Sequence, residues 1–489
     1  MDSCLKIPIY GGIIMLTQAK EAKKIAWWTL ALMAFSTVWG FGNVVNGYIY
    51  FGGTKVIFSW VLMFLLYFVP YALMVGELGA VFKESEGGVS SWVNATMGPK
   101  IAYYAGWTYW ACHVAYISSK GTGGLRALAW AVFQSVDKFD AMNTMLVQGV
   151  TFILFVFFCW LASRGLSVLK LLATIAGSTM FIISILYILL MLAAPVLNPH
   201  ANLLSVDLSF KHLLPSFNVN YFTSLSILVF AVGGCEKISP YVNKMKHPSK
   251  DFPKGMIALA IMVMVCAILG TIAMGMMFNP KEIDANFDSY VSNGAYWAFQ
   301  KLGNYYHLGN SLMVIYAWTN VIGQFSTLVL SIDAPLRMLL GSKEAKEFIP
   351  TKLLKQNKYG AYTNGIWMVG ILSGAIILVQ SVVPGATKVL TQLVKLNATT
   401  MPLRYLWVFA AYIALRMHKK HFQGSYQFVK NDKLAIFFGA WCFLVTALCC
   451  LLGIYSPDPF TLALNILTPV ILTALGIILP IIKQHEKNS

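Results

Sequence analysis

The segment AFSTVWGFGNVVNGYIYF, residues 34–51, reads as a membrane-buried helix that is interrupted in its middle by Gly40, Gly42 and Asn43. A helix that breaks inside a bilayer exposes backbone N–H and C=O groups, each of which costs several kcal/mol unless something satisfies it. We therefore expect the break to serve a function, and the rest of the sequence indicates which function this is.

The composition places the chain in a membrane. Of its 489 residues, 58% are hydrophobic and 11% are charged, whereas soluble domains are about half apolar and about a quarter charged. Runs of roughly 20 apolar residues are long enough to cross a bilayer. Such runs predict an all-α integral membrane protein with about twelve spans: 25–51, 55–82, 101–133, 144–163, 167–194, 218–242, 253–278, 307–336, 362–380, 389–416, 433–455 and 461–482.

The positive charges predict the orientation of these spans. With the N-terminus inside, 24 Lys or Arg residues lie in or beside cytoplasmic segments and 6 lie outside, as in KMKHPSKDFPK (244–254). The positive-inside rule then puts both termini in the cytoplasm of a multi-pass protein of the cell (inner) membrane. The net charge of +17 is thus mostly topological. We expect no nucleic-acid partner, because no loop is long enough to form a basic domain.

The cysteines and the N-terminus carry no further chemistry. Seven of the eight cysteines fall inside predicted spans without a CxxC pair, so we interpret them as small apolar residues. We expect no metal and no cofactor. The first 15 residues lack the pattern of a cleavable signal peptide, and Met1 and Met15 are both candidate start sites.

A second break occurs in the sixth span, YFTSLSILVFAVGGCEKISPYVNKM (221–245), at the run Gly-Gly-Cys-Glu of residues 233–236. We expect the first span to be unwound near residues 40–43 and the sixth near residues 232–236. Five spans separate the two broken segments, so they cross the membrane in opposite directions. This pattern predicts an inverted repeat with units 25–194 and 218–416, followed by two spans in 433–482. Residues 1–24 and 483–489 are then cytoplasmic tails.

Paired, glycine-interrupted segments in two repeats point to the binding site of a secondary transporter. A half-helix beginning near Asn43 suits a carboxylate, and the carbonyls that end the preceding half of span six, near Val232, suit an ammonium group. The predicted ligand is a small amino acid. The alternative is that the glycines only allow close packing, as GILSG (370–374) is expected to do. The predicted substrate-binding residues are Thr37, Gly40, Phe41, Gly42, Asn43, Tyr116, Lys120, Phe230, Val232, Gly233 and Gly234.

Three stretches resemble a known family: GGVSSWVNATMGPKIAYYAGW (87–107), VFAVGGCEKISPYVNKMKHPSKDFPKGM (229–256) and DAPLRMLLGSKEAKEFIP (333–350). They are similar to the amino acid–polyamine–organocation superfamily, within it to the glutamate:GABA antiporter family, and most to its YjeM-like branch. The resemblance implies a LeuT-type fold, a 5+5 inverted repeat plus two extra helices, and amino-acid transport by alternating access. Two features depart from the antiporters. The chain ends shortly after span twelve, without their C-terminal plug, and its first break reads Gly-Phe-Gly-Asn, so the substrate cannot be carried over.

Ionisable residues near the membrane midplane are costly and therefore functional candidates. Lys120, Glu236, Lys237 and Arg404 lie at this depth. We predict gating or proton-linked roles for Glu236, Lys237 and Arg404, with a structural salt bridge as the alternative for Glu236. Three cations against one acid favour an acidic amino acid as the substrate.

Lys120 continues a stripe that steps by 4, 3 and 4 residues along one face of span three, through Tyr109, His113 and Tyr116. Two hypotheses remain open for it: Lys120 binds an anionic side chain of the substrate, or it only balances the negative charge of Glu236. For His113 a core role is favoured over a metal role. Of the other ionisable residues in the spans, Arg126 and Lys395 are expected to snorkel to the outer surface, and Glu77 and Asp333 to make gate or loop contacts.

The sequence therefore predicts a secondary amino-acid transporter, with exchange favoured by the resemblance, of acidic amino acids such as glutamate and a related exchange partner. A proton-coupled symporter is the alternative, followed by a transporter-like sensor or a channel. No HExxH, GxSxG or phosphate-binding loop supports an enzyme or a primary pump. The predicted partners are the substrate and the lipid bilayer, and the oligomeric state, monomer or dimer, stays open.

Overall fold

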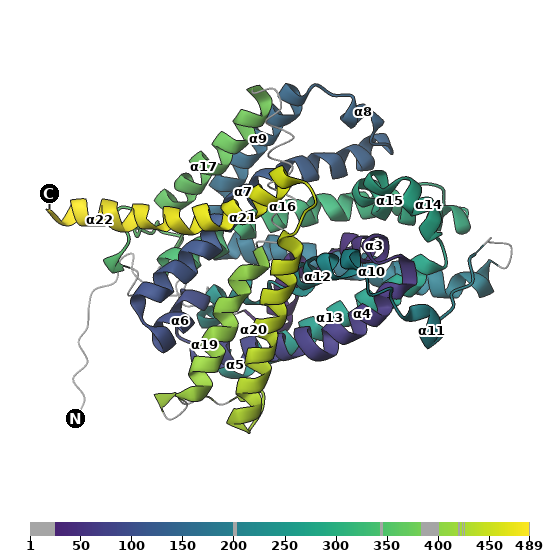
Figure 1. The fold of residues 1–489 in the computed structure, drawn as a ribbon. Coiled ribbons are helices and arrows are strands. Elements are labelled where there is room, and N and C mark those ends of the chain that lie inside the picture. Colours follow the sequence, from purple (N-terminus) through teal and green to yellow (C-terminus); the bar gives the residue numbers. More distant parts are fainter. Residues whose placement is uncertain are drawn as a thin grey trace, which may run out of the picture.

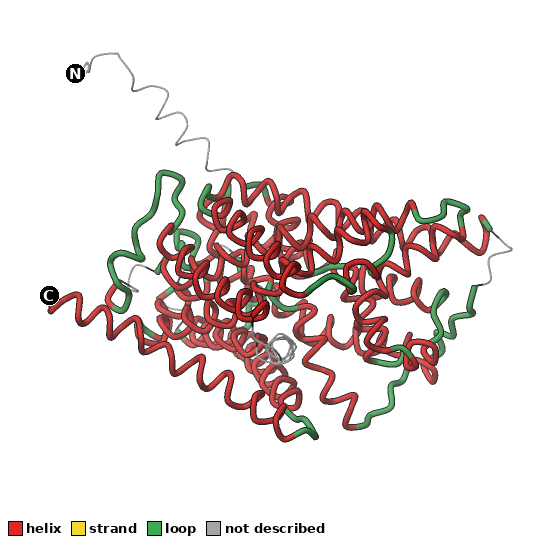
Figure 2. The backbone as a smooth tube through the Cα atoms, turned by 90° about the horizontal axis from the view of Figure 1, so that it is seen from above, coloured by secondary structure: helices red, strands yellow, loops and turns green. Residues whose placement is uncertain are grey.

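A computed structural model of the protein describes residues 25–198, 203–342, 346–382, 401–418, 421–422, 424 and 426–488. These residues form helices joined by mostly short loops, without a β-sheet (Figures 1 and 2). The first predicted repeat contains α2 (Trp27–Val38), α3 (Phe41–Tyr50), η1 (Gly53–Lys55), α4 (Val56–Met63), η2 (Phe64–Phe68), α5 (Val69–Val81), α6 (Val89–Met97), α7 (Pro99–Phe133), α8 (Asp137–Asp140), α9 (Thr144–Ala162) and α10 (Leu166–Leu197).

The rest of the described chain is also helical. The second predicted repeat contains α11 (Phe210–Leu213), α12 (Val219–Val232), η3 (Cys235–Lys244), α13 (Pro248–Gly275), α14 (Pro280–Ala285), α15 (Phe287–Tyr305), α16 (Ser311–Leu340), α17 (Thr363–Val382), η5 (Met401–Arg404) and α19 (Tyr405–Met417). The chain ends with α20 (Asp432–Ile454), α21 (Pro459–Ala474), η7 (Leu475–Ile477) and α22 (Ile478–Asn488), drawn in yellow-green and yellow in Figure 1.

Within the described residues, nine helical segments are long and apolar enough to cross a membrane, and the bent pair α2 and α3 makes a tenth. Two of the twelve predicted spans are not in this set. Span 101–133 coincides with α7, whose 35 residues suffice in length but include many glycines and polar side chains. Span 389–416 lies partly outside the described residues and ends with α19. The all-helical membrane architecture is therefore confirmed, whereas the division into two repeats stays a prediction.

Both predicted breaks are present. The first lies at Trp39 and Gly40, which are extended between α2 and α3, and the two helices bend by 40° there. The expectation that the unwound stretch also includes Gly42 and Asn43 is wrong, because the Asn43 N–H bonds the Gly40 carbonyl (2.9 Å) and closes the first turn of α3.

In the second break, α12 ends at Val232 and Gly233 is extended. Gly234 has φ 100°, a left-handed conformation that glycine adopts without a steric penalty. The predicted unwinding at 232–236 is thus narrower than expected, because Val232 completes α12 and η3 begins at Cys235 as a tighter 3₁₀ helix.

Small residues let the helices approach closely. A Cβ atom at Gly106 of α7 would lie 2.7 Å from the Met338 carbonyl oxygen of α16. In GILSG, a Cβ at Gly374 would lie 3.0 Å from the Phe152 ring of α9, so this motif packs one helix against another as expected.

The loops gather at two ends of the bundle. At one end, Lys244 binds Glu86 (2.9 Å) and the Asn357 amide donates to the Ser163 carbonyl (2.8 Å). These loops are among the Lys- and Arg-rich segments that the sequence predicts to be cytoplasmic, and we call this end of the bundle the basic side. At the opposite side, Asn310 bonds Gln134 (2.9 Å).

Candidate substrate-binding site

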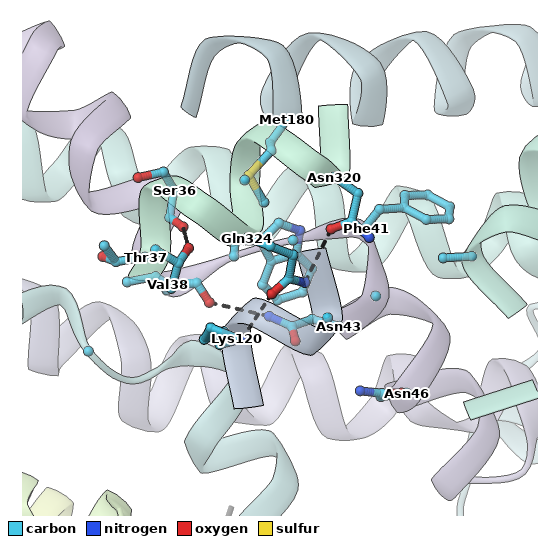
Figure 3. A pocket seen from close by; sticks show the side chains of 18 of the residues that line it. Ser36, Thr37, Val38, Phe41, Asn43, Asn46, Lys120, Met180, Asn320 and Gln324 are labelled. Atoms are coloured by element: carbon cyan, nitrogen blue, oxygen red, sulfur yellow. Dashed lines mark hydrogen bonds between the residues drawn. The ribbon is translucent and has the colours of Figure 1, made fainter. Parts of the chain in front are cut away.

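A cavity of about 390 Å³ lies where the two breaks meet (Figure 3). Its wall comes from α2, α3, α7, α10, α12, α15, α16, the start of η3 and the junction of η5 with α19. A volume of this order fits a small molecule. The site thus unites segments that are far apart in the sequence.

The cavity brings together most of the residues predicted to contact the substrate or to gate its path. Val232 and Glu236 are the exceptions, because both are fully buried behind the wall. The predicted residues that line it are Thr37, Gly40, Phe41, Gly42, Asn43, Tyr116, Lys120, Phe230, Gly233, Gly234, Lys237 and Arg404.

The N-terminus of α3 offers backbone donors to this cavity. Gly40 precedes the helix and no side chain caps it, so the N–H groups of Phe41 and Gly42 have no partner within the helix. A Cβ atom built on Gly42 would meet nothing within 4 Å. The helix end is therefore open to an anionic group such as a carboxylate.

Asn43 joins the two breaks. Its side-chain amide donates to the Val38 carbonyl at the end of α2 (3.3 Å) and to the Ala231 carbonyl in the last turn of α12 (3.4 Å). The bond to Val38 is drawn in Figure 3. One side chain thus fixes both half-helices beside the cavity, where their remaining end carbonyls can accept bonds from an ammonium group.

Four cationic side chains line the cavity, and these are Lys120, Arg126, Lys237 and Arg404. The described part of the cavity wall contains no Asp or Glu. Lys120 donates to Gln324 Oε1 (3.3 Å) and lies 4.5 Å from the centre of the Tyr116 ring. Lys237 donates to Ser331 Oγ (2.6 Å). Both ammonium groups are therefore held by neutral partners.

Glu236 has partners other than Lys120. Its Oε2 atom accepts a hydrogen bond from the Tyr71 hydroxyl, and its Oε1 atom lies 3.9 Å from Nε of Arg404. Among the described residues no ion pair joins Lys120 to Glu236, and the cation nearest to the carboxylate is Arg404. The structure therefore offers no direct contact for the hypothesis that Lys120 balances Glu236. The geometry matches the structural salt bridge considered as the alternative for Glu236, and the gating role remains a prediction.

The predicted stripe on α7 divides between two environments. Tyr116 and Lys120 line the cavity, whereas Tyr109 and His113 lie outside it and are buried. His113 bonds the Tyr109 carbonyl through Nδ1 (2.6 Å) and lies 3.2 Å from Nη1 of Arg404. His113 is therefore a core residue, as favoured from the sequence.

Three other expectations concern ionisable residues. Arg126 lines the cavity and pairs with the exposed Asp140 (2.7 Å), so its guanidinium lies near solvent, and its expected snorkelling stays a prediction. Glu77 and Asp333 form buried ion pairs, with Arg416 (2.6 Å) and Arg337 (2.6 Å), consistent with the expected gate or loop contacts. Lys395 lies outside the described residues.

A polar row on α16 also lines the cavity and was not among the residues predicted from the sequence. Asn320, Gln324 and Thr327 are spaced by 4 and 3 residues and all line the cavity. Asn320 accepts from Gln324 (3.3 Å), and Thr327 donates to the Ser36 carbonyl (3.1 Å). The signal was present, since three polar residues on one face of a membrane helix predict a face turned away from lipid.

Comparison with known proteins identifies the family of this chain. Residues 25–479 match the amino acid permease family. The chain is 45% identical to the aspartate/glutamate permease AcaP of Lactococcus lactis subsp. cremoris (strain MG1363), over 96% of this chain and 97% of AcaP. It is 25% identical to the inner membrane transporter YjeM of Escherichia coli (strain K12), over 80% and 81% of the two chains. It is also 24% identical to a glutamate/gamma-aminobutyrate antiporter of Lactococcus lactis subsp. lactis (strain IL1403), over 74% and 70%. The protein therefore belongs to the amino acid permease family of the amino acid–polyamine–organocation superfamily, and it is an amino-acid transporter of the membrane, not an enzyme.

Proposed function

We propose that this chain carries acidic amino acids, aspartate and glutamate, across the cell membrane by alternating access, in exchange for a related amino acid. The observation that carries the proposal is the charge of the cavity: four cations and, in the described part of its wall, no carboxylate. The similarity to a permease named for aspartate and glutamate supports the same substrate class.

Each part of an acidic amino acid has a matching group in the cavity. The α-carboxylate would accept from the free N–H groups at the start of α3. The ammonium group would donate to carbonyls at the ends of α2 and α12, beside Asn43. The side-chain carboxylate would bind Lys120, whose present partner is the neutral Gln324 amide.

The charge balance favours an anionic over a neutral ligand. Lys120 and Lys237 have no carboxylate within 4 Å among the described residues. An ammonium group in a membrane interior is costly until an opposite charge is near it. An acidic amino acid supplies one net negative charge, whereas a neutral amino acid supplies none.

The predicted orientation makes this an outward-facing form. If the basic side faces the cytoplasm, as the positive-inside rule requires, the cytoplasmic end is held by the pairs Lys244–Glu86 and Arg337–Asp333. The cavity extends the other way, to Arg126 and its exposed partner Asp140. Alternating access would then require the pair Lys244–Glu86 to separate.

Exchange, as distinct from proton symport, can be tested directly. Purified protein in liposomes preloaded with glutamate should accumulate radiolabelled aspartate well above empty liposomes, without an imposed proton gradient. Uptake into empty liposomes that depends on an inward proton gradient would instead establish the symport alternative. Uptake of neutral or cationic amino acids in preference to both acids would overturn the proposed substrate.

A further inference from the structure

Arg126 lies at the end of the cavity that is farthest from the basic side. Its Nη2 atom is 2.7 Å from Oδ1 of Asp140, the last residue of the short helix α8. Asp140 does not line the cavity, and its side chain is 49% exposed, against 28% for Arg126. The pair therefore stands where the cavity meets solvent.

The pair is built so that it can open. A partly exposed ion pair contributes little to stability because water and salt screen it. Asp140 also engages the guanidinium through a single short contact, whereas guanidinium and carboxylate groups can form two parallel hydrogen bonds. A free carboxylate that approaches from the solvent could thus replace Asp140 with better geometry.

Arg126 keeps a second anchor when Asp140 leaves. Its Nη1 atom donates to Oδ1 of Asn293 (3.4 Å), and the same oxygen accepts from Trp130 Nε1 (3.2 Å). The Trp130 ring in turn stacks on Tyr296, with ring centres 5.0 Å apart and planes 9° apart. Asn293 is therefore fixed independently of Asp140, and it holds the arginine in the wall of the cavity.

From this geometry we propose that Arg126 is an entry subsite that captures the side-chain carboxylate of an incoming acidic amino acid, and that Asp140 is the built-in competitor that the substrate displaces. The inference rests on the proposed function, since only an acidic substrate brings the required second carboxylate. Lys120 lies six residues earlier on α7, roughly 9 Å along the helix axis, so the carboxylate can pass from one cation to the next on its way to the breaks.

The asparagine variant of the competitor gives the sharpest test. Asp140→Asn keeps the shape of the side chain but removes its charge, so Arg126 becomes available to the substrate. The KM for aspartate uptake into proteoliposomes should fall by about 2- to 5-fold, which is the range that loss of a weak exposed ion pair permits, while kcat stays within 2-fold. Asp137→Asn is the matched control, because Asp137 lies on the same short helix but accepts from Ser135 (2.7 Å) instead of Arg126. Its KM should equal that of the wild type.

Arg126→Gln completes a double-mutant cycle. Arg126→Gln alone should raise the KM for aspartate. Adding Asp140→Asn to it should have no further effect on the KM, because the guanidinium for which Asp140 and the substrate compete is then absent. An unchanged or higher KM in Asp140→Asn would overturn the entry subsite, as would an Asp140→Asn effect of equal size with and without Arg126. If Arg126→Gln does not insert into membranes, the comparison of Asp140→Asn with Asp137→Asn still decides. A wild type that transports no acidic amino acid would refute the proposed function itself. Normal aspartate transport whose KM does not change in Asp140→Asn would refute only the entry subsite.

Discussion

Lys120 and Gln324 meet in the wall of the cavity, with the ammonium nitrogen 3.3 Å from the amide oxygen (Figure 3). α7 supplies one and α16 the other, and Gln324 also donates to Asn320 (3.3 Å). A neutral amide orients the cation without neutralising it. Lys120 is therefore positioned to distinguish an anionic substrate side chain from a neutral one.

Lys120→Met should reduce this discrimination. Losing a hydrogen bond between two charged groups costs about 1.5–3 kcal/mol, so the preference for glutamate over glutamine, measured as inhibition of labelled aspartate uptake, should shrink by about 10- to 150-fold. Lys301→Met is a suitable control, because Lys301 rests on the Phe278 ring (4.3 Å) outside the cavity wall. An equal loss of affinity for both amino acids would show that Lys120 is scaffolding.

Gly42 allows the carboxylate site to be blocked without disturbing the protein. A Cβ atom there meets no protein atom within 4 Å, and Gly42 lies in the first turn of α3. Replacing a helical glycine by alanine contributes up to about 1 kcal/mol of stability. Gly42→Ala and Gly42→Val should therefore fold normally while the side chain occupies the approach to the amides, and uptake should fall at least about 10-fold for valine. Wild-type uptake by Gly42→Val would mean that the break is only a packing feature.

The buried pair of Glu77 and Arg416 should be strongly coupled. Arg416 Nη2 lies 2.6 Å from Glu77 Oε2, which also accepts from the Tyr412 hydroxyl (3.1 Å) and the Phe428 amide (2.9 Å). Removing Arg416 leaves Glu77 as an uncompensated buried charge and costs about 3–5 kcal/mol, whereas Glu77→Gln leaves Arg416 paired with Asp432 (2.9 Å). Arg416→Met should therefore lower the melting temperature of the detergent-solubilised protein markedly, and Glu77→Gln should lower it less. The double variant should recover part of the loss, and strictly additive losses would contradict the coupling.

The pair Glu86–Lys244 predicts a pH dependence. Partial burial is the largest single influence and raises the pKa of Glu86, but the hydrogen bond and charge of Lys244, the hydrogen bond from Asn243 and the charge of Arg337 together outweigh it and lower the pKa below its usual range. A carboxyl with a lowered folded-state pKa contributes stability above its unfolded pKa of about 4.3, and this contribution is lost as the pH falls through the folded value.

Glu86→Gln should consequently destabilise the protein equally at pH 7.5 and pH 6, by no more than about 1 kcal/mol because the side chain is 38% exposed. The difference from the wild type should begin to shrink as the pH falls below about 4.3 and vanish only below the lowered pKa of the folded state. Thermal unfolding of both proteins across this range measures it. A destabilisation that already disappears between pH 7.5 and pH 6 would contradict the assigned direction of the pKa shift.

The sequence predicted the breaks more accurately than the contacts around them. Glycine clusters inside apolar runs identify a break directly, and both were found, although Gly42 and Val232 turned out to be helical. Ion-pair partners depend on how helices rotate and pack, which spacing alone does not determine. The sequence did not identify Asp140 as the partner of Arg126, and Lys120 was one candidate partner of Glu236, whereas Tyr71 and Arg404 are the residues that lie beside its carboxylate.

The central claim is that a cationic cavity without carboxylates in its described wall selects acidic amino acids, and equilibrium binding tests it most directly. Labelled aspartate bound to the purified protein should be displaced by unlabelled aspartate at concentrations at least about 30-fold lower than by asparagine, which has the same shape without the charge. That ratio corresponds to about 2 kcal/mol, the size of one charge-assisted hydrogen bond. Equal displacement by aspartate and asparagine would contradict the claim, as would binding of neutral amino acids without any binding of aspartate.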